Sequence, residues 1–402
     1  MAQENSFPKI SKELKFVLEC THDINKAAEI KELFPLLQWD NVINMAMTHR
    51  LFPFVYNAMR QFGSSEVPEN VIKLLQQEYM KSAIKVVGIA DEIVRIVNFM
   101  RDYGIQPLIL KGPPLSVRIN EDITLRPSSD IDILVDPLEF EKAEKILELM
   151  EYTRISPDFL LTPRKRKFYY KNDHHFEYFH NKHAILVELH WRIRSFDVKL
   201  FPTASSLSTQ KINITECLVP VMDDEYWLMY LMVHGYKHMW TRLRWLYDIK
   251  EFLNNNLDWD KIIFIANNSE LKSILHQTVI LLNVLFDVSI PDQLQESVVN
   301  DQKAWQLSNT VMENLCENTN KENLPNLKFS RLKNVNYYNF SSRWRNMLIY
   351  ISSLFKPTKD EFELIVLPDI LFPLYYLIKI FNLLWKRIKS TCNFINIYFL
   401  KP

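Results

Sequence analysis

The sequence predicts an α+β protein that is mostly helical, with a small mixed sheet flanked by helical regions. From Ile10 to Tyr103, and again from Asp223 onward, apolar residues recur at spacings of three and four, which is the period of an amphipathic helix. Between these regions, short apolar segments that begin at Pro107 alternate with helical ones, as in a sheet with helices packed on it. We therefore predict three domains: residues 1–104, 105–222 and 223–402.

Two signals divide the amino-terminal helical region. The stretch Gly63–Ser65, followed by Pro68, interrupts the periodic pattern, and a new helix is predicted to begin at Glu69. Gly104 directly follows the last periodic turn, and glycine readily takes the left-handed conformation that ends many helices. The helical region is therefore predicted to end immediately before the sheet.

The sheet region contains four predicted strands. They cover residues 107–110, 130–135, 174–180 and 184–193, and the last two form a hairpin with a turn at Asn181-Lys182. Two helices are predicted at Leu115–Ile119 and Glu139–Met150. The stretch Arg164–Lys171 combines basic with aromatic residues, which could bind a polyanion, but we interpret it as a solvated loop that leads into an edge strand.

Two carboxylates share one face of the strand 130–135. Residues two apart on a strand point the same way, so Asp130 and Asp132 are expected side by side. They repel each other, by roughly a few kcal/mol in a partly buried site, unless a cation separates them or one takes up a proton. Because acids alternate with apolar residues on many solvent-facing strands, this pattern alone is weak support for a metal site.

Further polar groups are predicted to join this pair. On the second strand of the hairpin, Glu188, His190 and Arg192 occupy the polar face, so Glu188 offers a third carboxylate. Lys111 and Gly112 follow the first strand; glycine lets backbone amides approach a phosphate, and lysine supplies a point charge. Mg²⁺ prefers oxygen ligands and keeps phosphates and waters among them, so two or three carboxylates suffice. The sequence therefore predicts a magnesium and phosphate site.

Composition and charge exclude several classes of protein. With 48 basic and 48 acidic residues the formal net charge is zero, which argues against long nucleic acid as a partner. The four cysteines lie far apart, without the spacing of a zinc knuckle or a disulfide framework, which fits a reducing compartment. We find neither a secretory signal nor a membrane span and expect a cytoplasmic protein; the most apolar stretch, Val366–Trp385, is interpreted as a buried or interfacial helical pair.

Four motifs resemble those of one family. They are LKGPPL, LRPSSDIDILVD, VELHW and HGYKHMWTRLRWLYDI. Together they resemble an uncharacterised bacterial nucleotidyltransferase family within the polymerase-β-like nucleotidyltransferase superfamily, which implies a small mixed sheet of that type. The flanks Trp39–Tyr56 and Leu367–Ile378 also resemble the family, so the likeness extends over most of the chain.

The resemblance implies a set of site residues and a reaction. Asp130 and Asp132 would ligate metal, and Glu188 would complete this catalytic site. The implied nucleotide-binding residues are Lys111, Gly112, Arg126, Ser129, His190, His238 and Arg242. Two Mg²⁺ ions would carry a nucleoside triphosphate such as ATP and activate a hydroxyl-bearing acceptor for attack on the α-phosphorus. Lys111 and Arg126 would stabilise the leaving pyrophosphate.

Three questions stay open at this point. The superfamily usually has serine after the glycine, whereas Pro113 follows Gly112 here and removes one amide donor from the phosphate site. The same ions could instead support phosphoryl transfer from the γ-phosphorus, and a non-catalytic, antitoxin-like binding protein is a third reading. The acceptor, whether small molecule, sugar, peptide or protein, is not indicated by the sequence.

Two groups of polar residues each allow a functional and a purely structural interpretation. His234, Lys237, His238 and Arg242 could form a helical wall over the nucleotide, or a solvated face on which Asp248 pairs with Arg244. Five histidines crowd the hairpin region, namely His174, His175, His180, His183 and His190. Zinc is disfavoured there because strand spacing places them on both faces and no cysteine joins them.

Overall fold

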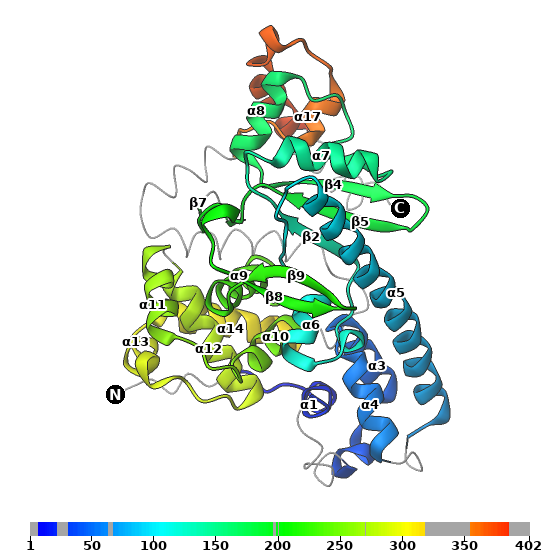
Figure 1. Cartoon of the computed structure of the whole chain (residues 1–402). Helices are drawn as coiled ribbons and strands as arrows, with labels where there is room; N and C mark the ends of the chain where they lie inside the picture. The colour runs from blue at the N-terminus through cyan, green and yellow to red at the C-terminus, as the bar shows by residue number, and fades with distance from the viewer. Residues whose placement is uncertain are drawn as a thin grey trace, which may run out of the picture.

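The computed structural model describes residues 7–21, 31–62, 67–195, 198–199, 201–269, 271–317 and 354–385. It confirms the mostly helical α+β fold, in which helices surround a five-stranded mixed sheet (Figure 1). Buried apolar side chains form one continuous core that extends from Leu14 to Tyr375. The division into three domains stays a prediction.

The central sheet has the strand order β1-β2-β5-β4-β3. Its strands are β1 (Leu108–Ile109), β2 (Asp130–Leu134), β3 (Thr153–Ser156), β4 (His175–His180) and β5 (Ile185–His190). Only β2 and β5 pair in parallel; the other three pairs are antiparallel. Two small hairpins accompany it: β6 (Arg194–Ser195) with β7 (Val198–Lys199), and β8 (Thr209–Ile214) with β9 (Cys217–Met222). The predicted hairpin of β4 and β5 is confirmed.

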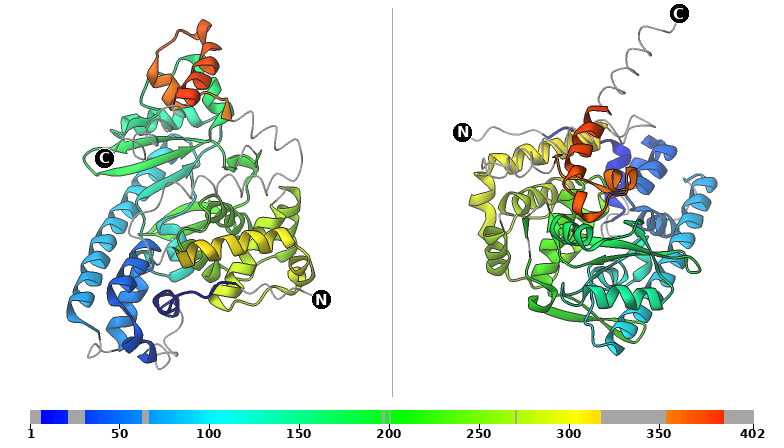
Figure 2. Two further views of the ribbon diagram at one scale, coloured as in Figure 1. Left: turned by 180° about the vertical axis from the view of Figure 1, so that it is seen from behind. Right: turned by 90° about the horizontal axis from the view of Figure 1, so that it is seen from above.

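The amino-terminal helices lie beside and below the sheet. They are α1 (Lys12–Glu19), α3 (Trp39–Thr48), α4 (Phe52–Phe62) and α5 (Glu69–Asp102), with a 3-10 turn η2 (Phe34–Leu36). Helix α5 has 34 residues and runs along one side of the molecule, away from α14 in both views of Figure 2. It begins at Glu69 as predicted, and Gly104 beyond its end has φ 76°, the expected left-handed conformation. Residues 63–66 lie outside the described part of the chain.

Helices α7 (Phe140–Leu149) and α8 (Pro163–Asn172) cover one face of the sheet (Figure 1). The ring of Phe140 packs edge-on against Phe176 of β4 at 5.6 Å and against Trp191 at 5.0 Å, measured between ring centroids. The prediction of a loop at Arg164–Lys171 is therefore wrong, because these residues lie in α8. The Thr162 side chain caps the helix by accepting from the backbone N–H of Lys165.

Aromatic packing explains why this basic stretch is helical. Tyr169 is buried and its ring lies 5.8 Å from that of Phe176 in the sheet. The Lys165 side chain is 2% exposed, and its ammonium group lies 5.1 to 5.7 Å from the ring centres of Phe159, Phe362 and Tyr375. Cation–π contacts of this kind offset part of the cost of burying a charge. The apolar and aromatic residues between the charges thus direct the helix onto the core.

The remaining helices pack on the opposite face of the sheet or beyond it. They are α6 (Pro113–Asn120), α9 (Asp224–Lys237), α10 (Arg244–Phe252), α11 (Trp259–Asn268), α12 (Lys272–Phe286), α13 (Gln295–Val299) and α14 (Gln302–Glu317), with 3-10 turns η3 (Ile123–Leu125), η4 (Ala204–Ser206) and η5 (Asp292–Leu294). Trp227 of α9 donates its indole N–H to the carbonyl of Leu110 at 2.6 Å. This bond fixes α9 beside the end of β1.

The apolar stretch Val366–Trp385 is not a buried helical pair. It follows α17 (Lys359–Leu364) and contains the 3-10 turn η7 (Asp369–Leu371) and a helix over 374–385. Phe372 and Tyr375 pack on α8 and α17, but many other side chains are exposed, including Phe381 at 71%. Among the described residues, no helix is long and apolar enough to cross a membrane. The asparagine-rich stretch Asn318-Thr319-Asn320, which the sequence predicts to be a loop, lies outside the described residues.

Candidate active site

Three carboxylates are brought together by the parallel pairing of β2 and β5. Asp132 lies directly opposite Glu188 in this register, and Asp130 is two residues away on the same face of β2. The side chain of Asp132 is only 3% exposed, whereas those of Asp130 and Glu188 are 21% and 24% exposed. All three line one cavity, which has a volume of about 470 Å³.

The positive charge between the two aspartates belongs to Lys111. Its Nζ lies 3.3 Å from Asp130 Oδ2 and 3.1 Å from Asp132 Oδ2. Burial alone would lower the pKa of Lys111, but the nearby Asp132, Asp130 and Glu188 outweigh it and raise that pKa. Lys111 is therefore a cation at neutral pH and neutralises part of the acidic group.

His190 is the second partner of the acids. Its Nε2 lies 3.5 Å from Asp132 Oδ1 and 3.3 Å from Glu188 Oε2. Burial opposes a charge on this imidazole, yet the two carboxylates raise the pKa of His190. In return, and although burial alone would raise it, His190 lowers the pKa of Glu188 to about 2. Asp132, Glu188 and His190 each have a donor atom within 4.8 Å of the others, so they could hold a metal ion.

A fourth carboxylate, Glu177, was not expected at this site. It lies on β4 directly opposite Glu188, so the acids form a row across three neighbouring strands. Burial, followed by the charge of Glu188, raises the pKa of Glu177. Glu177 lines the same cavity. The hairpin pattern contained this information, because residues opposite each other on paired strands share a face.

The other walls of the cavity are basic. Six of its lining residues carry a positive side chain, against four acids, and they come from α9, α10 and four separate connecting segments. They are Arg50, Lys111, Arg126, Lys237, Arg242 and Arg244. Arg50 was missed in the sequence because it lies in the flank Trp39–Tyr56, outside the four motifs. Burial, together with the charge of Arg242, lowers the pKa of Arg50 to about 10. A cavity with such charges is suited to a polyanion that brings its own cation.

Asp248 holds two of these arginines in a buried cluster. Its Oδ2 accepts from Arg126 Nε at 3.0 Å, and its Oδ1 accepts from Arg244 Nε at 2.6 Å. All three side chains are at most 7% exposed. The predicted pairing of Arg244 with Asp248 is therefore confirmed, but the prediction that this pair is exposed to solvent is wrong. Two guanidinium groups share one carboxylate, which leaves one positive charge in excess beside the cavity.

The turn between α9 and α10 positions the other predicted wall residues. Met239 and Trp240 both have positive φ, which folds Trp240 back against Gly235. His238 and Arg242 therefore line the cavity and pack on Trp245. The ring centroid of His238 lies 5.1 Å from that of Trp245, and the guanidinium carbon of Arg242 lies 5.5 Å from the Trp245 ring centre. The structure thus brings together the residues of the proposed helical wall.

The glycine turn is placed less favourably for a phosphate. Gly112 is buried, has φ 90° and is followed by Pro113 and Pro114 in the first turn of α6. Two of the amide donors that a helix N-terminus normally offers are therefore missing. Lys111 and Ser129 line the cavity, and the Ser129 hydroxyl donates to Asp130 Oδ1 at 3.2 Å. Side chains, rather than the turn itself, are the donors presented here.

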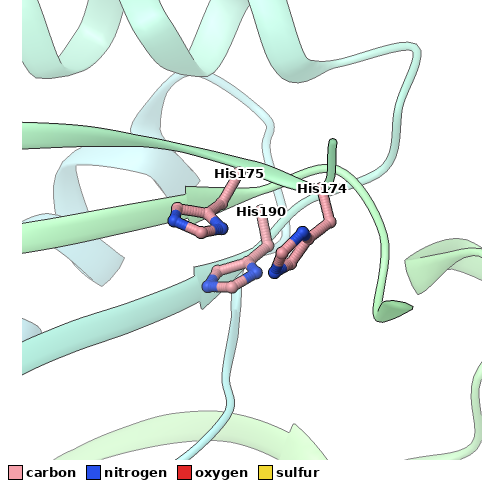
Figure 3. Close-up of side chains that lie close together, drawn as sticks. All are labelled: His174, His175 and His190. Carbon is pink, nitrogen blue, oxygen red and sulfur yellow. The ribbon is translucent and has the colours of Figure 1, made fainter. Parts of the chain in front are cut away.

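Three of the five hairpin histidines meet, contrary to the expectation that they scatter. His175 lies directly opposite His190, and His174 immediately precedes β4 (Figure 3). Burial lowers the pKa of His174 to about 4 and that of His175 to about 3. His180 and His183 stack on each other at the far end of the hairpin.

A mixed sheet that presents a row of acids to a basic cavity is the arrangement of an enzyme acting on phosphate esters with a divalent cation. The model of a family described as uncharacterised nucleotidyltransferase matches residues 35–287, which is more than half of the chain, and the chain belongs to this family. It is therefore a transferase of nucleotidyl groups. The match includes every residue of the site and ends just after α12, so Leu367–Ile378 lies outside it. No curated protein and no solved structure matches the chain.

Proposed function

We propose that this protein transfers a nucleoside monophosphate from a nucleoside triphosphate to a hydroxyl group of an acceptor, with Mg²⁺ as the cofactor. One observation carries this proposal: Asp130, Asp132 and Glu188 share one face of the sheet and look into a cavity with basic walls. Metal-dependent nucleotidyl transfer needs carboxylates that bind a cation and positively charged side chains that bind the triphosphate.

The acids fit a magnesium ion by their chemistry and burial. Asp132 Oδ2 is buried and makes no hydrogen bond of good geometry within the described part of the chain, although Lys111 Nζ is near. Lys111 compensates the charge of this oxygen without a well-aligned hydrogen bond, so a cation ligand would complete its coordination. Asp130, Asp132 and Glu188 would hold the ions, which when bound would screen the triphosphate and lower the pKa of the acceptor hydroxyl.

Lys111 has two partners in this reading. Without nucleotide it neutralises Asp130 and Asp132, at 3.3 and 3.1 Å. Its long side chain would turn to a phosphate oxygen when a cation takes its place between the acids, because an ammonium group is a flexible donor of point charge. The positive charge of Lys111 would thus be paired with a carboxylate in the absence of nucleotide and with a phosphate when nucleotide is bound.

Arg126 and the helical turn would bind the rest of the triphosphate. Asp248 fixes Arg126 in one orientation at the edge of the cavity, so little rotamer entropy is lost when phosphate binds. His238 and Arg242 face the same cavity from the α9–α10 turn. Arg126 on one side and the turn residues on the other would orient the α-phosphorus toward the acceptor.

Labelled nucleotides test the reaction. The purified protein is incubated with Mg²⁺, candidate hydroxyl acceptors or itself, and either α-labelled or γ-labelled triphosphate. Nucleotidyl transfer puts only the α label into the product, whereas phosphoryl transfer, which the same acids could support, puts only the γ label there. Asp132→Asn should abolish transfer. Asp136→Asn is the matched control, because Asp136 follows the same strand but does not line the cavity.

A further inference from the structure

Three imidazole rings meet in the cavity beside the acids. His175 of β4 and His190 of β5 are paired residues, and His174 lies one residue before β4 (Figure 3). The distances between ring centroids are 4.5 Å for His174 and His175, 4.8 Å for His175 and His190, and 5.6 Å for His174 and His190. Two of the three rings stand on hydrogen-bonded strands, so their relative position is fixed by the sheet.

Their nitrogen atoms are close to the spacing that a metal ion requires. One nitrogen from each ring lies within 4.8 Å of the other two. Nitrogens around a tetrahedral zinc ion are about 3.3 Å apart, given zinc–nitrogen bonds of about 2.0–2.1 Å. Small rotations of the side chains therefore suffice to bring all three onto one ion.

One ring nitrogen of the cluster lacks a hydrogen-bond partner. His175 Nδ1 is buried and has no hydrogen bond within the described residues, whereas His190 Nε2 contacts the carboxylates of Asp132 and Glu188 at 3.5 and 3.3 Å. The His190 side chain is only 8% exposed. A buried ring nitrogen without a partner is unfavourable, so the cluster favours a ligand that would satisfy this atom of His175.

His174 is oriented for the same purpose. Its Nδ1 lies 3.0 Å from Asp173 Oδ1, which leaves Nε2 as the atom that faces the other rings and the cavity. A carboxylate that holds the second nitrogen of a metal-binding imidazole is the common outer contact of zinc sites. The Lys237 ammonium group lies 3.4 Å from Nε2, so this position already accommodates a positive charge.

We propose that His174, His175 and His190 bind a first-row divalent transition-metal ion of the zinc type. Imidazole nitrogen favours such ions over Mg²⁺, which prefers oxygen. All three residues line the cavity, so a further coordination position would be open to a bound molecule, as in catalytic zinc sites. This site goes beyond the proposed nucleotidyl transfer and does not depend on it.

Metal titration of the full-length protein tests the site without measuring activity. Protein treated with a chelator is titrated with Co²⁺, a coloured substitute for zinc, in the presence of excess Mg²⁺, and bound Co²⁺ is then displaced with Zn²⁺. We expect about one ion per chain, with visible absorption typical of nitrogen ligation. Absence of stoichiometric binding under these conditions would overturn the proposal, whatever the result of the nucleotide assay.

Variants locate the ion. His174→Gln and His175→Gln should abolish stoichiometric binding, and Asp173→Asn should weaken it about 10–100-fold. His183→Gln is the matched control, since His183 belongs to the same hairpin but contacts Glu92 instead. Asp130→Asn should retain the ion, which separates this site from the magnesium site.

Two results would contradict this location. One is unchanged binding in both His174→Gln and His175→Gln; the other is loss of binding in His183→Gln. Circular dichroism checks that each variant is folded. If His175→Gln fails to fold because it disturbs β4, the titrations of His174→Gln and Asp173→Asn decide, as both residues precede that strand.

Discussion

Gly235 and Gly88 are both helical glycines, yet the structure gives alanine opposite effects at the two positions. A Cβ atom at Gly235 would lie 2.1 Å from the nearest atom of the Trp240 ring and 2.5 Å from two others. The Trp240 ring is fully buried and its indole N–H donates to Gln277 at 3.3 Å, so the ring cannot retreat into solvent. We expect Gly235→Ala to lower the free energy of unfolding by about 1–3 kcal/mol, the usual cost of overpacking.

Gly88 provides the control. It lies inside α5, is exposed, and a Cβ atom there would have nothing within 4 Å. Alanine in an exposed helix interior is more favourable than glycine by roughly 0.5–1 kcal/mol. Gly88→Ala should therefore raise the free energy of unfolding by about that amount, although it is the same substitution in the same type of secondary structure.

Urea denaturation followed by circular dichroism measures both variants on one scale. The nucleotide affinity of the folded proteins is a second measurement, because His238 and Arg242 stand on the turn that Trp240 anchors. We expect weaker binding in Gly235→Ala and unchanged binding in Gly88→Ala. The reasoning fails if Gly235→Ala unfolds at the same urea concentration as the parent protein, since Trp240 would then not pack on α9 as described.

Three further perturbations test the site and its surroundings. Asp248→Asn should lower the free energy of unfolding by about 3–5 kcal/mol in urea denaturation, because it leaves Arg126 and Arg244 buried without their carboxylate. Lys111→Met should weaken nucleotide binding about 10–100-fold in isothermal titration calorimetry, the value of one charge-assisted hydrogen bond; an unchanged affinity would exclude its role. Burial alone would raise the pKa of Glu361, but hydrogen bonds from its neighbours lower it from 4.5 to about 2. Its contribution to stability is therefore present above pH 4.5 and lost as the pH falls toward 2, and amide exchange in α17 should accelerate over this window in the parent but not in Glu361→Gln.

The elements of the sheet were predictable because their signals are local. Alternation of acid and apolar residues over 130–135 has the period of a strand, and it fixes which side chains share a face. The same argument placed Glu188 on the polar face of its own strand. Neither pattern says which strand lies next to which, so the direct pairing of Asp132 with Glu188 needed the structure.

The histidine cluster shows how a small error in a turn changes a site. A two-residue turn at Asn181-Lys182 would pair His180 with His183 and set His175 opposite Glu188. The hairpin instead pairs His180 with Ile185, which makes a four-residue loop and sets His175 opposite His190. This shift by two residues keeps every side chain on its face but exchanges its partner. The face of the sheet on which each side chain lies was therefore predictable, but its partner on the neighbouring strand was not.

Burial of charge was the least predictable property. Arg126 and Asp248 are 122 residues apart in the sequence, and their contact at 3.0 Å arises from the packing of α10 next to the segment before β2. The pairing of Arg244 with Asp248 follows from helical spacing, but its isolation from water depends on elements that no local pattern describes. A charged residue in a helical pattern is solvated by default, and only the tertiary contacts overturn that expectation.

The direction of the strands gives the cavity two chemically different ends. Along β5 the polar face changes from Glu188 to His190 in one two-residue step, and along the antiparallel β4 from Glu177 to His175. Oxygen donors therefore lie at one end of the sheet face and nitrogen donors at the other, with His190 Nε2 only 3.3 Å from Glu188. Because the pairing of β2, β5 and β4 fixes the backbone positions of both rows, the acids and the histidines keep their relative places in the sheet. Mg²⁺ would thus bind at the oxygen donors and a zinc-type ion at the nitrogen donors. A bound triphosphate would lie within reach of both ions.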